Sequence, residues 1–204
     1  MLPIQPKRKC HDIVAIGAWA GGVEAVSQLL SLLPGDLAAA VIVVLHRAPS
    51  RQSHLQGILS RRSQLRVVIP SQGDRLDYGV CVVGTPEQHL TVGPGLQLHL
   101  VPNHFYRSHN IDALFNSLAR IAGNRTIGVI LSGMLKDGPL GLKAIKEAGG
   151  TALVQSREEA AYAEMPTSAI KHDGAIDLIA PVSKIAADIV RLAGRVGAPA
   201  SQSH

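Results

Sequence analysis

The chain has 204 residues, the length of one domain that is large enough to bury a core. Hydrophobic residues make up 46% and aromatic residues only 3%, so an aliphatic core is expected. The net charge of +5 is modest, and few aromatic side chains are present to stack on bases, so nucleic-acid binding is not expected. No apolar run reaches about 18 residues, and the first residues lack the apolar segment of a signal peptide, so no membrane insertion is expected. Two cysteines without disulfide spacing predict a cytoplasmic protein with reduced thiols.

The chain alternates short apolar runs with amphipathic ones between two polar ends. Residues 1–11, with two prolines and a basic cluster, predict a disordered leader, and residues 194–204 predict a flexible tail. The predicted strands are 12–17, 40–45, 65–69, 79–83, 90–92, 96–101, 126–131, 151–154 and 176–179. The predicted helices are 22–33, 54–62, 110–122, 140–148, 166–171 and 181–193, with Asn110 as the N-cap residue of the third.

This order of elements predicts an α/β fold in a single domain, residues 12–193. Several predicted strands, such as 40–45 (AVIVVL), are apolar throughout, which is typical of parallel strands that are covered on both faces. The runs at 90–92 and 96–101 form a predicted antiparallel hairpin around Gly93-Pro94-Gly95. We therefore expect a doubly wound, mostly parallel sheet with a hairpin insertion and helices on both faces. Functional groups are expected at the carboxyl ends of its strands.

The turn at residues 17–22 (GAWAGG) links the first predicted strand to the first predicted helix. One interpretation is a dinucleotide fingerprint, G-x-G-x-x-G, for which Gly17 and Gly22 fit. Trp19 replaces the middle glycine, however, and its indole would obstruct the approach of a pyrophosphate. The second strand also ends in His46 rather than in an acidic residue that could bind a ribose hydroxyl. A nucleotide site is therefore disfavoured.

The other interpretation is a nucleophile elbow, G-x-S-x-G, in which Trp19 stands where the serine belongs. His46, at the end of the second strand, would supply the general base. Asp137, in the loop 132–139 (SGMLKDGP), would orient that base. Each signal alone is weak, because strand-end histidines are often structural and Asp-Gly is a common turn.

Six segments that occur in order along the chain carry a family resemblance. They are residues 16–22 (IGAWAGG), 44–46 (VLH), 86–90 (PEQHL), 111–117 (IDALFNS), 131–138 (LSGMLKDG) and 165–166 (MP). Together they resemble the catalytic domain of the bacterial chemotaxis protein-glutamate methylesterases, over roughly residues 12–190.

The resemblance implies a role for each matching residue. His46 matches the catalytic general base, Asp137 the acid that orients it, and Met134 the residue whose backbone amide helps to form the oxyanion hole. Trp19 occupies the position of the nucleophilic serine, and an indole cannot attack an ester. We therefore expect hydrolysis of glutamyl methyl esters to be absent or strongly reduced. Ser132 is a poor substitute, because no elbow exposes its hydroxyl.

The partners that the resemblance implies are chemotaxis receptor helices that carry methylated glutamate side chains. The alternative is a non-catalytic protein of chemotaxis-type signalling that binds receptor helices or acts as a scaffold. The family commonly carries an N-terminal receiver domain, for which eleven residues leave no room, so a separate response-regulator protein is the expected partner. Neither a cofactor nor a metal is expected for this type of ester hydrolysis. We expect His89 and His104 to be surface residues, Glu158 and Glu159 to lie on a solvated face, and Met165-Pro166 to have a packing role at one side of the cleft. Tyr106, Arg107 and Asn110 match a segment that approaches the site in the family, and both contact with a substrate and a solvated loop are open for them.

Overall fold

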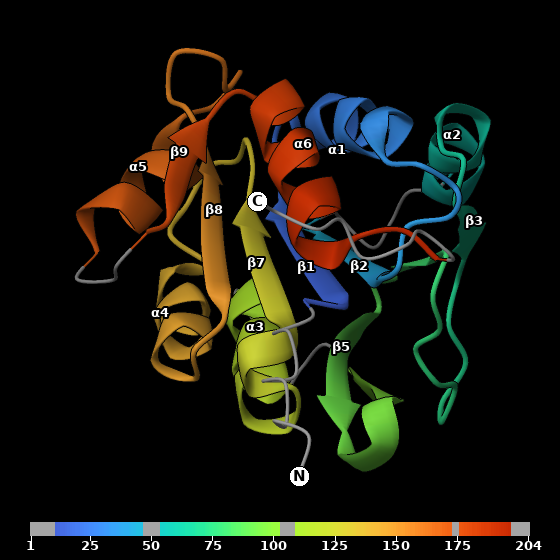
Figure 1. Ribbon diagram of the computed structural model, residues 1–204. Coiled ribbons are helices and arrows are strands. Elements are labelled where there is room, and N and C mark those ends of the chain that lie inside the picture. Colours follow the sequence, from blue (N-terminus) through green and yellow to red (C-terminus); the bar gives the residue numbers. More distant parts are fainter. Residues whose placement is uncertain (1–10, 47–53, 103–108, 173–175, 197–204) are drawn as a thin grey trace, which may run out of the picture.

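The computed structural model describes residues 11–46, 54–102, 109–172 and 176–196. Seven parallel strands form one sheet in the spatial order β3-β4-β2-β1-β7-β8-β9 (Figure 1). Their bounds are β1 Ile13–Ala18, β2 Ala40–Leu45, β3 Arg66–Val68, β4 Val80–Val83, β7 Thr126–Ile130, β8 Thr151–Gln155 and β9 Leu178–Ala180. The prediction of a mostly parallel α/β sheet is confirmed.

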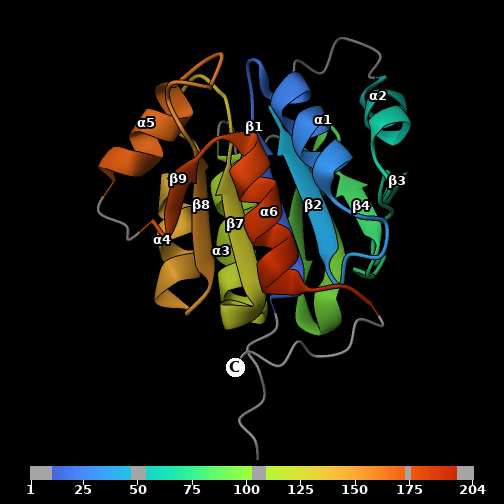
Figure 2. The ribbon, with the colours of Figure 1, turned by 45° about the horizontal axis from the view of Figure 1, so that its top comes forward.

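Helices cover both faces of this sheet. Their bounds are α1 Gly22–Leu32, α2 Leu55–Arg62, α3 Asn110–Ile121, α4 Pro139–Glu147, α5 Glu164–Lys171 and α6 Val182–Ala193. Helices α1 and α6 lie side by side over one face, and α3 and α4 lie over the other (Figure 2). The doubly wound arrangement expected from the order of elements is therefore present.

The predicted hairpin forms a small sheet of its own. Strands β5 Gln88–Gly93 and β6 Gln97–Pro102 pair antiparallel and are joined by a 3-10 turn at Pro94–Leu96. Leu90, Val92 and Leu98 bury their side chains in the cluster that contains α3. The hairpin thus extends the layer on the α3 side rather than the main sheet.

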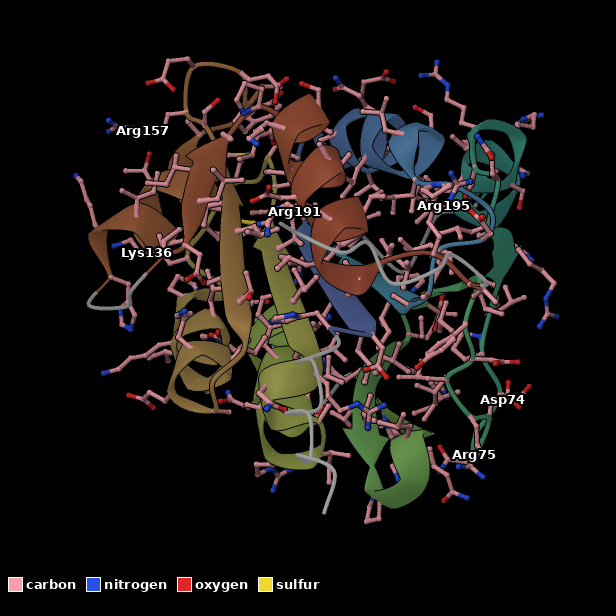
Figure 3. All side chains as sticks on the ribbon, viewed as in Figure 1. Asp74, Arg75, Lys136, Arg157, Arg191 and Arg195 are labelled. Atoms are coloured by element: carbon pink, nitrogen blue, oxygen red, sulfur yellow. The ribbon has the colours of Figure 1, made fainter. Side chains whose placement is uncertain are left out.

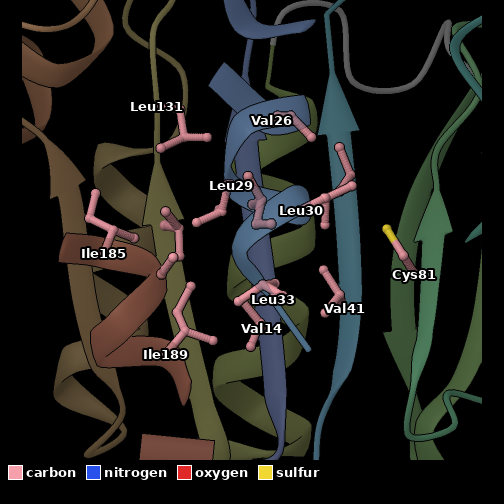
Figure 4. Packing of buried hydrophobic residues seen from close by; sticks show 14 of the residues in the cluster. Val14, Val26, Leu29, Leu30, Leu33, Val41, Cys81, Leu131, Ile185 and Ile189 are labelled. Atoms are coloured by element: carbon pink, nitrogen blue, oxygen red, sulfur yellow. The ribbon is translucent and has the colours of Figure 1, made fainter. Parts of the chain in front are cut away.

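Burial explains why the strands are apolar throughout. Charged side chains such as Arg157 and Arg191 lie on the outside of the molecule (Figure 3). In β1, Val14 packs toward α1 and α6 (Figure 4), whereas the next residue, Ala15, belongs to the cluster on the α3 side. Successive side chains of a strand point to opposite faces, and both faces of β1 are covered by helices, so all six of its residues are buried.

Strand β1 lies in the middle of the sheet, with β2 on one side and β7 on the other. The chain first builds one half of the sheet from β1 through β2, and later returns to the other side of β1 with β7. The carboxyl ends of β1 and β7 therefore form a topological switch point, where α/β proteins place their ligands. The loops that begin at Trp19, His46 and Leu131 meet at this edge.

The predicted leader and tail lie mostly outside the described residues. At one end, His11 is buried, and its Nε2 lies 3.0 Å from Thr151 Oγ1. At the other end, Arg195 donates to the Asp36 carboxylate at 2.7 Å and forms an isolated bridge with Leu37. Both His11 and Arg195 therefore contact the domain. Within the described ranges, no helix combines the length and the apolar character needed to cross a bilayer.

Candidate active site

The turn between β1 and α1 fixes the backbone of Trp19 from both sides. Gly21 has a φ of 70°, and the Gly22 N–H donates to the Trp19 carbonyl oxygen at 2.8 Å. A Cβ atom on Gly22 would lie 2.7 Å from the Ala18 Cβ atom, so the turn requires glycine at that position. The Trp19 N–H donates to the Ser132 carbonyl oxygen at 3.0 Å. The indole is half-buried at the carboxyl end of β1.

His46 follows β2, the neighbour of β1, and its ring lies beside Trp19. The two ring centroids are 6.0 Å apart with an interplanar angle of 66°, an edge-to-face arrangement. His46 Nε2 lies 2.6 Å from Asp137 Oδ2. With Nε2–H donating to the carboxylate, Nδ1 is the ring nitrogen that can accept a proton. The predicted base and the predicted acid are therefore hydrogen-bonded to each other.

Asp137 is 1% exposed, and its carboxylate has partners besides His46. Oδ2 also accepts the Ile111 N–H at 2.8 Å, and Oδ1 accepts the Asp112 N–H at 3.0 Å. These two amides belong to the first turn of α3, where the helix dipole favours negative charge. Hydrogen bonds to an ionised group are stronger than neutral ones. The start of α3 thus holds the carboxylate in place beside the imidazole.

The prediction that Asn110 caps this helix is wrong. Asn110 is the first helical residue, and His109 occupies the N-cap position without a side-chain bond to the helix. The carboxylate of Asp137, from the loop after β7, accepts the N–H groups that a local cap would bind. A cap that comes from a distant segment leaves no local sequence pattern.

A second carboxylate, that of Asp112, lies beside Asp137. Burial raises the pKa of Asp112, and the negative charge of Asp137 raises it further. Its Oδ1 accepts the Gly141 N–H at 2.7 Å and thereby joins α3 to α4. Because the folded-state pKa is above the ordinary value, the ionised carboxylate costs stability at neutral pH and the protonated one does not.

We expect Asp112→Asn to raise the free energy of unfolding at neutral pH. The amide oxygen can still accept the Gly141 N–H, and the repulsion with Asp137 disappears. The gain should be largest above the raised pKa of Asp112 and should vanish as the pH falls toward the ordinary value of 3.8. Urea unfolding of Asp112→Asn and of the unmodified protein, at several pH values from neutral down to about 4, measures the gain in free energy of unfolding. A difference that does not change with pH would contradict this account of Asp112.

The loop after β7 presents the backbone amide of Met134. Leu135 has a φ of 67°, and its N–H donates to Glu164 Oε2 at 3.1 Å, which fixes the loop against α5. Residues other than glycine adopt this conformation rarely and at a cost. Within the described parts of the chain, the Met134 N–H has no hydrogen-bond acceptor. It is therefore open to a ligand, as an oxyanion-hole donor must be.

Ser132 joins three segments rather than presenting a nucleophile. Its Oγ donates to the Ala20 carbonyl oxygen at 2.9 Å and accepts the Tyr162 N–H at 3.0 Å. Its N–H donates to Gln155 Oε1 at 2.8 Å, and the residue is 1% exposed. A buried hydroxyl with two backbone partners stabilises the site and has no access to a substrate.

We expect Ser132→Ala to lower the free energy of unfolding by about 1 kcal/mol, because it removes two hydrogen bonds of a buried hydroxyl, to the Ala20 carbonyl and from the Tyr162 N–H. Urea unfolding measures the loss. The control is Ser31→Ala, since the exposed Ser31 hydroxyl donates to the Gln28 carbonyl of its own helix. That change should stay within about 0.5 kcal/mol. Equal effects of the two substitutions would contradict the role of Ser132.

His109, Asp112 and Asp137 form a group whose side-chain atoms lie within 4.8 Å of one another. Each carboxylate already accepts backbone N–H groups, and Asp137 also binds His46. Oxygens that a cation would need thus already accept N–H groups at the starts of α3 and α4. The donor set fits helix capping better than metal coordination.

A pocket of about 970 Å³ opens next to Asp137, between the loop after β7 and α5. Lys136 and Leu135 line one side of it, and residues of α5 line the other. Sequence reasoning did not find this pocket, because it depends on how two distant segments pack. Met165, in the same helix, is fully buried beneath Gly133, as its predicted packing role requires.

The remaining predicted residues have mixed outcomes. The expectation that His89 lies on the surface is wrong. Its side chain is fully buried, at a position of β5 that alternates with Leu90 and Val92. His104, Tyr106 and Arg107 lie outside the described residues. Trp19, His46, Asp137 and the Met134 loop are brought together at one edge of the sheet.

Comparisons with known proteins point to one family. A model of the CheB methylesterase family matches residues 14–189. The protein-glutamate methylesterase/protein-glutamine glutaminase of Geobacillus kaustophilus is 38% identical over 92% of this chain and 55% of its own length. The protein of the same description from Moorella thermoacetica is 35% identical over 94% of this chain and 46% of its own. The chain thus spans about half the length of these relatives.

The crystal structure of the Thermotoga maritima CheB methylesterase catalytic domain matches with a TM-score of 0.82 and 28% identity, covering 89% of this chain and 98% of that one.

Proposed function

Because this chain belongs to the CheB methylesterase family, we propose that it is a member that binds its protein partner but hydrolyses glutamyl methyl esters little or not at all. The observation that carries the proposal is the pairing of an assembled His46–Asp137 dyad with a tryptophan at the nucleophile position. The relatives are described as protein-glutamate methylesterase/protein-glutamine glutaminase, so a glutamyl side chain is the expected ligand.

With a serine at position 19, the surrounding groups would support acyl transfer. The hydroxyl would attack the ester carbonyl, and His46 would take its proton at Nδ1 while Asp137 holds the other ring nitrogen. The Met134 amide would donate to the oxyanion. Departure of methanol, with the proton returned by His46, would leave an acyl-enzyme, and water would then release the carboxylate.

Trp19 interrupts this sequence at its first step. The indole has no group that can attack a carbonyl carbon, and an aromatic side chain of this kind occupies roughly 150–250 Å² of surface. It stands edge-on to His46, in the space where an ester would have to meet the base. Ser132 cannot take over, since its hydroxyl is buried and bonded to Ala20 and Tyr162.

We propose chemotaxis receptor helices with methylated glutamates as the partner, and a separate response-regulator protein as the source of control. The scaffold alternative, in which Trp19 only packs, predicts a different behaviour of the indole. Trp19 is the chain's single tryptophan, and it is half-buried. Its fluorescence therefore reports directly on the site.

The test is to titrate this protein with a methylated receptor cytoplasmic fragment while following both Trp19 emission and methanol release. We expect a saturable change in emission, protection of Trp19 from acrylamide quenching, and no methanol above the level of buffer. Emission that stays constant while the fragment is added would contradict binding at this site. Methanol release at a catalytic rate would contradict the loss of hydrolysis.

A further inference from the structure

The two peptide groups that flank Met134 are both anchored to the start of α5. The group before it carries the Gly133 carbonyl oxygen, which accepts the Met165 N–H at 2.9 Å. The group after it carries the Leu135 N–H, which donates to Glu164 Oε2 at 3.1 Å. One anchor is therefore made by the backbone of α5, and the other is made by a side chain, that of Glu164.

The planarity of peptide groups converts the first anchor into a direction for the Met134 N–H. No peptide bond among the described residues is cis, so this N–H points away from the Gly133 carbonyl oxygen and from the Met165 amide that binds it. A Cβ atom on Gly133 would lie 3.2 Å from the Trp19 nitrogen, which places the loop against the elbow. The contacts with α5 thus orient an amide that lies beside the elbow.

The residue after Met134 has a backbone conformation that needs support. Leu135 has a φ of 67°, a region that residues other than glycine enter rarely and at a cost. Its side chain is 47% exposed, so burial of its apolar atoms offsets little of this cost. The bond from its N–H to the Glu164 carboxylate does offset it, because hydrogen bonds to an ionised acceptor are stronger than neutral ones.

We propose that Glu164 is a positioning residue that holds the Met134 N–H in the orientation required of an oxyanion-hole donor. The carboxylate acts through Leu135 and does not itself touch the ligand. The proposal rests on the proposed function, because it takes the Met134 N–H as the donor to the carbonyl oxygen of a glutamyl side chain. It adds the side chain on which the orientation of that donor depends.

The Glu164 carboxylate has no other partner to serve. Within the described ranges, the Leu135 N–H is its one hydrogen-bond donor, and no cationic side chain forms an ion pair with it. The side chain is exposed, although its helix neighbours Met165 and Pro166 are buried. Substitution of Glu164 therefore removes one contact of the loop and leaves the packing of α5 in place.

The first experiment observes the Met134 amide by NMR in protein labelled with ¹⁵N-methionine. The chain has three methionines, and Met134→Leu identifies the signal of interest by its loss. Glu164→Ala removes the acceptor, whereas Glu164→Gln keeps an oxygen acceptor without the charge. The control is Glu158→Ala, which removes an exposed carboxylate from the loop after β8. Circular dichroism verifies that each variant is folded.

We expect Glu164→Ala to shift or broaden the Met134 signal, because Leu135 then leaves its positive-φ conformation and the loop before it reorients. Glu164→Gln and Glu158→Ala should leave the signal close to its original position. An unchanged Met134 signal in Glu164→Ala would overturn the proposal. Equal displacement by the glutamine and alanine variants would also overturn it, because the effect would then come from the lost charge.

The second experiment measures methanol release from methylated receptor in the Trp19→Ser background. Loss of one oxyanion-hole donor lowers turnover about 10²–10³-fold, and here the donor is misoriented rather than removed. We therefore expect Glu164→Ala to lower kcat about tenfold or more with little change in KM, and Glu164→Gln to restore kcat to within about threefold. A higher KM with an unchanged kcat would contradict the proposal, since it would indicate a role in ligand binding alone.

Failure of this proposal differs from failure of the proposed function. The NMR sample contains no ester and keeps Trp19, so its result for Glu164 stands even where Trp19→Ser releases no methanol. That lack of release would instead refute the assembled site. A Met134 signal that ignores Glu164→Ala would refute the role of Glu164 and would leave the proposed loss of hydrolysis untouched.

Discussion

Trp19→Ser should convert this protein into an ester hydrolase. The substitution supplies a hydroxyl at the β1–α1 elbow, beside a His46–Asp137 pair that is already hydrogen-bonded at 2.6 Å. It also removes the indole that stands edge-on to the imidazole. Loss of the serine from an intact triad costs about 10⁶-fold in turnover. We expect the serine variant to release methanol from methylated receptor at least about 10³-fold faster than Trp19→Ala.

Trp19→Ala is the matched control, because it opens the same space without adding a nucleophile. The double variant Trp19→Ser/His46→Ala tests the base and should return the rate to that of Trp19→Ala, since an unassisted serine is a weak nucleophile. Equal rates for the serine and alanine variants would show that the elbow, the dyad and the Met134 amide do not act together.

Asp137→Ala should cost about 3 kcal/mol of unfolding free energy, which is large for a residue that resembles a catalytic acid. The carboxylate is 1% exposed and accepts two amides at the start of α3 in addition to His46. Hydrogen bonds to charged groups contribute about 1.5–3 kcal/mol, and the amides left behind would be buried without acceptors. Urea unfolding at neutral pH measures the loss.

Two further substitutions serve as comparisons for Asp137→Ala. Asp137→Asn keeps one oxygen acceptor but points an NH₂ group toward an N–H donor, so it should lose roughly half as much. Glu147→Ala removes an exposed carboxylate of α4 whose one ion-pair partner within the described ranges is Lys143 of its own helix. That change should cost no more than about 0.5 kcal/mol. A loss at Asp137 as small as at Glu147 would refute the capping role.

The layered fold could be predicted because each strand and helix carries its own local signal. An apolar run such as Ala40–Leu45 indicates a strand that is covered on both faces, as observed. The start of α5 could not be placed as well, because Glu164 and Met165 precede the proline that the prediction used as its first residue. Pro166 lies in the first turn, where it costs no hydrogen bond.

The candidate site was predictable where a residue follows a strand end, and less so where two loops meet. Trp19, His46 and Asp137 come from loops at one sheet edge, which topology alone brings close. Glu159 is exposed, as expected, but its Oε2 also accepts Gln155 Nε2 at 2.8 Å and the Val182 N–H at 2.7 Å. Such contacts between distant segments follow no periodic pattern, so they could not be predicted from the sequence.

We propose that Trp19 alone separates an assembled site from catalysis. The most direct measurement compares methanol release from methylated receptor by the unmodified protein and by Trp19→Ser in one experiment, at equal protein concentration. The account predicts no release above the level of buffer for the unmodified protein and sustained turnover for the serine variant. Release by the unmodified protein at a rate comparable to that of the variant would contradict it.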